Sequence, residues 1–296
     1  MDLPIACTLG QDCYIETFFD TDPGPGRADH TCGFRTRDGH RGIDFAVRSF
    51  EALESGVDVR AAAPGVVAAT RDGVAGQPPY ERFTGENACG NGVRIKHEGG
   101  LQTLYCHLDA GSIGVAQGQT VEAGQTIGRI GLSGLTNFPH LHFAVLSKEG
   151  RPVDPFGPEQ AEGTCGAPDV SYWNDPPTYQ PTGFFTAGFT DAVPGFDSVK
   201  SGDARRTSVT KTDAIVLYAH MFLAQHGDLV EYDIQGPGGV AFSHSEILKA
   251  PRKNLMRAFG RKAPKAGWPK GRYTGAITLT RKGRFLGKRY AYVIVE

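Results

Sequence analysis

The stretch Asn137-Phe138-Pro139-His140-Leu141-His142-Phe143-Ala144-Val145 decides the fold of the first half of the chain. The apolar and β-branched residues after Pro139 indicate a strand, and two histidines enter that strand one residue apart. Side chains at i and i+2 of a strand share a face and lie roughly 6–7 Å apart. His140 and His142 could therefore serve one metal ion and one substrate atom, or they could be two unrelated surface or core histidines.

The rest of the first half consists of short strand-like runs between glycine turns. These runs lie at residues 43–47, 57–60, 65–70, 91–97 and 101–108, and a series of very short strands follows at residues 114–131. Residues 1–36 are loop-like and contain the breaker cluster Asp22-Pro23-Gly24-Pro25-Gly26. In residues 101–108, Leu104, Cys106 and Leu108 share one face. If that face is the core, His107 points outward, toward a cleft or solvent.

The second half predicts another β domain after a Pro/Gly-rich linker. Strand-like runs cover residues 213–224, 229–235, 272–280 and 290–295, and residues 245–259 suggest a short helix that Pro251 interrupts. This pattern favours a β-sandwich of immunoglobulin-like type. We therefore expect an all-β protein with an N-terminal Cys-containing wrapping segment (1–36), a first domain (37–160), a linker (161–183) and a basic β-sandwich domain of unassigned role (184–296).

Length and composition agree with two turn-rich β domains. The chain has 296 residues with 40 Gly, 19 Pro and 40% hydrophobic residues, which argues against disorder. No run of about twenty apolar residues is present, so no transmembrane segment is expected. The start, Met1-Asp2-Leu3-Pro4, lacks the basic and apolar regions of a signal peptide, although a mature secreted chain with an added Met would look the same.

The net charge of −1 hides an asymmetry between the two halves. Residues 1–179 carry 13 Lys/Arg and 23 Asp/Glu, whereas residues 180–296 carry 18 Lys/Arg and 9 Asp/Glu. Between Lys249 and Arg272 there are nine basic residues and no acidic one. This basic stretch could bind an anionic polymer, lie against the acidic first half, or form a solvated face. No nucleic acid is expected as a partner.

All six cysteines fall in the first half, and none forms a CxxC pair. An even count without metal-type spacing favours disulfides and an oxidising compartment. Cys7 and Cys13 are close enough in sequence for a local bridge. A hairpin at residues 93–105 would bring Cys106 near Cys89, which leaves Cys32 and Cys165 by elimination. Sequence alone does not settle the connectivity.

A metal site is predicted from residues that an all-β domain could bring together. His40 and Asp44 stand at the entry of one strand, and His142 lies on a later strand. These nitrogen and oxygen ligands suit zinc, and three protein ligands leave one position open, as in catalytic zinc sites. His107 and His140 would then act as general base, general acid or transition-state stabiliser in hydrolysis by a metal-activated water.

These residues resemble the M23 (lysostaphin/LytM-type) zinc metallopeptidases. The family marks HxxxD, YxHL and HxH followed by Phe occur here as His40-Arg41-Gly42-Ile43-Asp44, Tyr105-Cys106-His107-Leu108 and His140-Leu141-His142-Phe143. The resemblance covers about residues 30–150. The tyrosine that many members carry in a longer loop before HxxxD is absent here, where that loop is compressed to residues 32–39.

The resemblance implies a LytM-type antiparallel β-sheet or barrel-sandwich domain that binds one Zn²⁺ per chain through His40, Asp44 and His142, with His107 and His140 catalytic. It implies an endopeptidase that cuts stem or cross-bridge peptides of bacterial peptidoglycan in the periplasm or outside the cell. Two other hypotheses remain. The chain could be a latent or regulatory LytM-like module whose cleft is covered, or a secreted zinc peptidase that acts on proteins.

Overall fold

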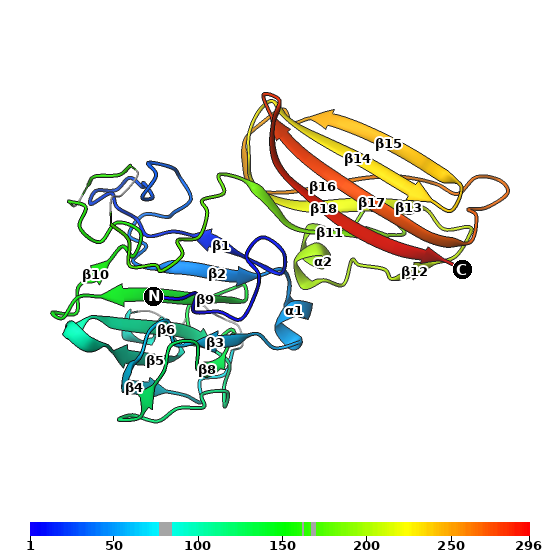
Figure 1. Cartoon of the computed structure of the whole chain (residues 1–296). Helices are drawn as coiled ribbons and strands as arrows, with labels where there is room; N and C mark the ends of the chain where they lie inside the picture. The colour runs from blue at the N-terminus through cyan, green and yellow to red at the C-terminus, as the bar shows by residue number, and fades with distance from the viewer. Residues whose placement is uncertain (77–84, 162, 167–169) are drawn as a thin grey trace. The chain divides into compact units, whose positions relative to one another are not determined.

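The computed structural model describes residues 1–76, 85–161, 163–166 and 170–296 (Figure 1). The chain divides into two compact units, Met1–Thr178 and Tyr179–Glu296. The finer boundaries expected around residues 36, 160 and 183 stay predictions. No helix among the described residues is long and apolar enough to cross a membrane.

The first unit consists of strands and a few single helical turns. In chain order the elements are β1 (Cys13–Thr17), β2 (Ile43–Val47), α1 (Phe50–Glu54), β3 (Asp58–Arg60), β4 (Gly65–Arg71), η2 (Gly85–Asn87), β5 (Asn91–Lys96), η3 (Glu98–Gly100), β6 (Gln102–Leu108), β7 (Thr120–Val121), β8 (Thr126–Arg129), β9 (His140–Leu146) and β10 (Pro152–Val153).

The main sheet of the first unit has the antiparallel order β1-β2-β9-β6-β5-β4-β7, and β10 also pairs with β9. Strands β3 and β8 form a separate pair. The three neighbours β2, β9 and β6 are those whose sequences carry the histidine motifs. One face of these strands is apolar and fully buried, through Ile43, Phe45, Tyr105, Leu141 and Phe143. The expected all-β antiparallel class is confirmed for this unit.

The predicted inward face of β6 is confirmed for Cys106 and Leu108, which are 1% and 0% exposed, but the opposite face is buried as well. Thr103 and Tyr105 are fully buried, and the Tyr105 hydroxyl accepts a hydrogen bond from the Ala62 amide at 2.8 Å, whereas Leu104 is only partly buried. The alternation of β6 breaks at His107, whose φ of +65° lies in the left-handed region. His107 is 6% exposed, so of the two expected surroundings, a cleft or solvent, open solvent is excluded.

Three disulfides stabilise the first unit. They join Cys7 to Cys13, Cys32 to Cys165 and Cys89 to Cys106, the same pairs that the sequence suggested. The bridge between Cys32 and Cys165 closes a loop of 133 residues across the unit. The segment before β2 also joins the fold directly, because β1 pairs antiparallel with β2 at the edge of the main sheet.

The second unit contains β11 (Gly183–Thr190), α2 (Phe196–Ser201), β12 (Ser208–Val209), β13 (Ile215–Ala224), β14 (Asp228–Gly236), β15 (Gly239–Ile247), β16 (Arg252–Arg261), β17 (Gly271–Arg281) and β18 (Arg284–Val295). One sheet has the order β11-β13-β16, and the other has the order β12-β18-β17-β14-β15.

Both sheets of the second unit contribute to one hydrophobic core. Leu217 and Met221 of β13 lie in the same buried cluster as Tyr232 of β14 and Ile277 of β17. The unit is thus two sheets that enclose an apolar core, while an immunoglobulin-like topology stays a prediction. The helix expected at residues 245–259 is wrong, because β15 and β16 cover this range except for residues 248–251. Tertiary pairing of β16 with β13 overrides the local helix propensity.

Candidate metal and catalytic site

The register of β2 against β9 brings the predicted ligands together. Asp44 lies opposite His142, and Cys106 of β6 lies opposite His142 on the other side of β9. Gly42 is required at this crossing, because a Cβ there would lie 2.6 Å from His142 Cε1 and 2.7 Å from the Phe143 carbonyl oxygen. Any larger residue at position 42 would displace the His142 ring.

His40, Asp44 and His142 place three ligand atoms in a compact triangle. His40 Nε2 lies 3.0 Å from Asp44 Oδ1 and 3.2 Å from His142 Nδ1, and His142 Nδ1 lies 2.8 Å from the same carboxylate oxygen. Asp44 is 1% exposed and His40 is 4% exposed. Burial would raise the pKa of the Asp44 carboxyl, but His40, His140 and His142 together hold that pKa well below its usual range.

One hydrogen bond to a group outside the triangle fixes the tautomer of His40. Its Nδ1 lies 2.7 Å from the carbonyl oxygen of Phe18, which can only accept a hydrogen bond. In the neutral ring, His40 Nδ1 therefore carries the proton, and Nε2 offers a lone pair toward Asp44 Oδ1, itself an acceptor. His40 Nε2, Asp44 Oδ1 and His142 Nδ1 therefore have at most one proton between them, the ring proton of His142. A divalent cation satisfies all three, so the donor set fits zinc.

Asp44 uses its second oxygen for an arginine that the sequence patterns did not single out. Arg37 Nη1 donates to Asp44 Oδ2 at 2.8 Å, while about half of the arginine side chain (52%) is exposed. Such partners of metal ligands orient the ligand and tune its basicity. The sequence feature that could have pointed to Arg37 is its position in the compressed loop, three residues before His40.

His107 and His140 lie beside the triangle with their ring centroids 4.7 Å apart. His107 Nδ1 donates to the Ser133 carbonyl at 2.8 Å, and His140 Nδ1 donates to the Phe138 carbonyl at 2.8 Å. Each Nε2 is therefore left without a proton in the neutral ring. His140 Nε2 is buried, has no hydrogen-bond partner among the described residues, and lies 3.7 Å from Asp44 Oδ1.

Electrostatics keep His107 and His142 neutral. Burial, followed by the nearby His140 and His142, lowers the pKa of His107 well below its ordinary value. Burial also lowers the pKa of His142, although the hydrogen bond to Asp44 opposes this shift. A neutral imidazole can act as a metal ligand or as a proton acceptor, and these two environments favour such roles at neutral pH.

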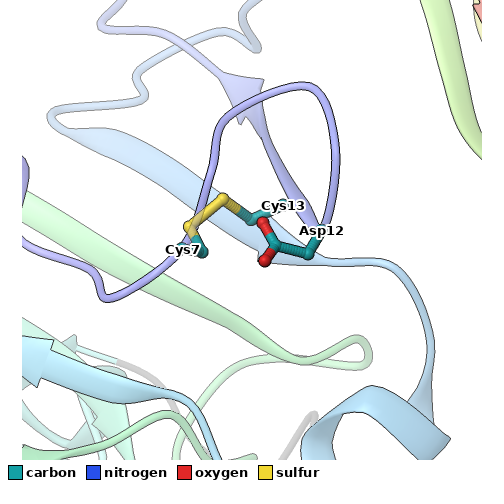
Figure 2. A group of neighbouring side chains, drawn as sticks. All are labelled: Cys7, Asp12 and Cys13. Carbon is teal, nitrogen blue, oxygen red and sulfur yellow. A yellow bond between two sulfur atoms is a disulfide. The ribbon is translucent and has the colours of Figure 1, made fainter.

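A second group of possible ligands, Cys7, Asp12 and Cys13, does not fit a metal (Figure 2). Both sulfurs are bonded to each other in a disulfide, and Asp12 Oδ1 accepts a hydrogen bond from the Thr8 amide at 2.6 Å. His97 also lies outside the site. Its Nδ1 pairs with the Pro64 carbonyl and its Nε2 with Thr103 Oγ1, each at 2.8 Å.

Comparison with known proteins locates the family resemblance in the same segment. The model of peptidase family M23 matches residues 38–155. A DD-carboxypeptidase/endopeptidase, Mpg, of Neisseria meningitidis is 38% identical over 117 residues, which are 39% of this chain and 22% of that protein. The peptidoglycan DD-endopeptidase ShyA of Vibrio cholerae is 36% identical over 115 residues, again 39% of this chain and 22% of that protein.

Among solved structures, a zinc-containing peptidase from Vibrio cholerae is 30% identical, with a TM-score of 0.31, over 47% of this chain and 39% of that chain. The chain spans about a fifth of the length of the curated relatives named above. The matched segment contains His40, Asp44, His107, His140 and His142. This chain therefore carries a domain of peptidase family M23 at residues 38–155.

Proposed function

We propose that the protein is a zinc-dependent endopeptidase that hydrolyses peptide bonds of bacterial peptidoglycan. The observation that carries the proposal is the triangle of His40 Nε2, Asp44 Oδ1 and His142 Nδ1 beside two histidines, His107 and His140, whose Nδ1 atoms donate to backbone carbonyls. The named relatives, a peptidoglycan DD-endopeptidase among them, support the substrate class. Three disulfides support a periplasmic or secreted location.

The chemistry divides between the metal and the two histidines. His40, Asp44 and His142 would hold a zinc ion, which would supply a Lewis acid to polarise the scissile carbonyl and to make water nucleophilic near neutral pH. His107 Nε2 and His140 Nε2 are the proton acceptors at the site. One of them takes the proton released as water adds to the carbonyl carbon, and the proton then passes to the leaving amine nitrogen as the C–N bond breaks.

Arg37 and the Phe18 carbonyl act as positioning groups in this proposal. Arg37 holds Asp44 Oδ2, and this orients Oδ1 toward His40 and His142. The Phe18 carbonyl holds the His40 ring through Nδ1. Phe18 belongs to the N-terminal segment, which therefore supports a ligand directly. Removal of residues 1–36 would take this support away, so truncation is a poor way to test whether the segment covers the cleft.

The proposal is tested with purified peptidoglycan and three proteins: the wild type, His142→Ala and His107→Ala. We expect the wild type to bind one zinc per chain and to solubilise peptidoglycan. His142→Ala should lose both zinc and activity, whereas His107→Ala should keep zinc and lose activity by about 10²-fold or more. A wild-type protein that binds zinc but releases nothing from peptidoglycan or from peptides would favour the latent or regulatory module.

The alternative of a peptidase that acts on proteins is separated by a second substrate. Amino groups released from peptidoglycan are compared with those released from a Gly-rich protein under the same conditions. We expect release from peptidoglycan. Release from the protein alone would contradict the proposed substrate class while leaving the zinc chemistry intact.

A further inference from the structure

The second unit presents two exposed tyrosines on the outer face of its five-stranded sheet. Tyr290 and Tyr292 of β18 are 67% and 54% exposed, whereas the alternate residues Val293 and Val295 are buried in the core. Since Tyr290 and Tyr292 are two residues apart, their side chains share a face and lie roughly 7 Å apart. Large aromatic side chains gathered on an exposed face mark a binding surface more often than isolated ones do.

The strand register shows what lies beside these rings. Strands β18, β17, β14 and β15 lie side by side in Figure 1. Three outward residues of β18 each have a small residue opposite them on β17, and each of these small residues has a polar residue opposite it on β14. The rows are Tyr292-Thr274-Gln235, Tyr290-Ala276-Asp233 and Lys288-Thr278-Glu231. We call these nine residues, together with Arg272, the tyrosine face.

The tyrosine face therefore has an aromatic edge, a low floor and a polar edge. Thr274, Ala276 and Thr278 are short, so the floor lies below the tyrosine rings. Asp233 and Glu231 are exposed on the far side of the floor. Their carboxylates accept hydrogen bonds, and the amide of Gln235 can both donate and accept. Together they supply a row of hydrogen-bonding groups parallel to the aromatic edge.

Two cations hold the tyrosine rings. The Arg272 guanidinium carbon lies 4.5 Å from the centroid of the Tyr292 ring, and Lys288 Nζ lies 5.1 Å from the centroid of the Tyr290 ring. These contacts restrict the rings, which lowers the entropy that a ligand must remove when it stacks on them. More than half of each tyrosine still faces solvent.

The charges of the tyrosine face match a neutral polymer better than an anionic one. Arg272 and Lys288 carry two positive charges, and Glu231 and Asp233 carry two negative charges on the other edge. A polyanion would be attracted by one edge and repelled by the other. A sugar ring places its C–H bonds against the negative face of an aromatic ring, and its hydroxyls pair with carboxylate, amide and threonine groups.

We propose that the tyrosine face binds the glycan strand of peptidoglycan, a β-1,4-linked chain of N-acetylated sugars. The identity of the polymer rests on the proposed function, whereas the sugar chemistry rests on the face itself. Bound in this way, the second unit would hold the protein on the cell wall while the first unit reaches the peptides. This role differs from the anionic polymer that the basic sequence stretch suggested.

The test uses the full-length protein and a glycan without peptides. Pelleting with insoluble chitin and calorimetry with a soluble chitohexaose measure binding for the wild type, for Tyr290→Ala/Tyr292→Ala and for Tyr290→Phe/Tyr292→Phe. All assays contain a zinc chelator, and chitin has no peptide bond, so binding is measured apart from hydrolysis. Because both tyrosines are exposed, neither double variant should change the unfolding midpoint by more than a surface substitution does.

We expect the wild type to bind chitin and the hexasaccharide, and the alanine variant to lose affinity by about ten-fold or more. The phenylalanine variant, which keeps the rings, should stay close to the wild type. No binding by the wild type, or equal binding by the alanine variant, would overturn the proposal. Binding to heparin in place of chitin, or a dimer that sedimentation detects and the alanine variant abolishes, would also overturn it.

Discussion

At the scale of single residues, Asp44 performs two tasks with its two oxygens. Oδ1 faces His40 and His142, and Oδ2 accepts the hydrogen bond from Arg37. This division keeps a fully buried carboxylate paired on both sides, which a buried charge requires.

The Arg37 contact predicts a measurable effect on zinc binding. We expect Arg37→Ala to weaken zinc affinity by about 10-fold to 100-fold, as other changes next to metal ligands do, and Arg37→Lys to restore part of it. Competition with a chromophoric chelator measures this affinity. Arg94→Ala, at an exposed arginine on β5, is the matched control. Equal affinities for Arg37→Ala and Arg94→Ala would show that Arg37 does not position Asp44.

Asp154 predicts a pH dependence of stability. It is 7% exposed, and its Oδ2 has no hydrogen-bond partner within the described ranges. Burial raises its pKa from 3.8 to about 7, with a further contribution from Asp29, while the hydrogen bond from the Phe156 amide opposes the shift. Between these two pKa values the folded state keeps a proton that the unfolded state releases. The free energy of unfolding therefore falls as pH rises through this window.

Asp154→Asn should remove this contribution. We expect the free energy of unfolding of this variant to fall less steeply between about pH 4 and 7 than that of the wild type. The two slopes should differ by at most about 1.4 kcal/mol per pH unit, which corresponds to one proton. Denaturant unfolding at several pH values measures the slope, with the exposed Asp109→Asn as control. Identical slopes for the wild type and Asp154→Asn would mean that Asp154 is ionised in the fold.

At the scale of elements, β6 and its disulfide position His107. The His107 amide donates to the Cys89 carbonyl at 2.8 Å, and Cys89 is bonded to Cys106, the residue before His107. The positive φ of His107 requires support from its surroundings, because β6 alone would not favour that conformation. The disulfide therefore fixes a catalytic candidate as well as the strand pair.

Removal of this disulfide should affect both stability and catalysis. We expect Cys89→Ala/Cys106→Ala to lower the free energy of unfolding by about 3 kcal/mol, from the entropy of a 17-residue loop, and to reduce peptidase activity. Cys7→Ala/Cys13→Ala is the matched control. It removes a disulfide whose cysteines are 6 residues apart in sequence and which lies away from the histidines. Activity that survives equally in both variants would contradict the role given to Cys89–Cys106.

The strands were predictable where the sequence alternates or carries a dense apolar run. Residues 43–47 and 140–146 agree with the expected strands, and their antiparallel pairing follows from the all-β class. The inward turn of His107 was not predictable, because it depends on a left-handed residue that only the folded surroundings favour. Arg37 and the Phe18 carbonyl were missed for a similar reason. Their contacts depend on how a loop without periodicity folds back on β2.

At the scale of the whole molecule, the two units have separate cores and one tryptophan each. Trp173 lies in the first unit and Trp268 in the second, and both are largely buried. The proposed zinc site uses residues of the first unit alone. Zinc should therefore stabilise that unit and leave the second unchanged.

Single-tryptophan variants can test this separation. In Trp268→Phe the fluorescence reports unfolding of the first unit, and in Trp173→Phe it reports unfolding of the second. The comparison starts from zinc at a thousand times its dissociation constant. We expect a chelator to lower the free energy of unfolding of the first unit by about 4 kcal/mol and to leave that of the second unit unchanged. A chelator that shifts both transitions equally would contradict a zinc site confined to the first unit.

The most direct test of the account is digestion of purified peptidoglycan followed by mass analysis of the soluble products. We predict fragments in which a peptide bond has gained one water and exposed a new amino group, with the glycan bonds intact. These fragments should disappear with a chelator and in His142→Ala. Zinc-loaded protein that releases no such fragments, or releases the same fragments after chelation, would contradict the account.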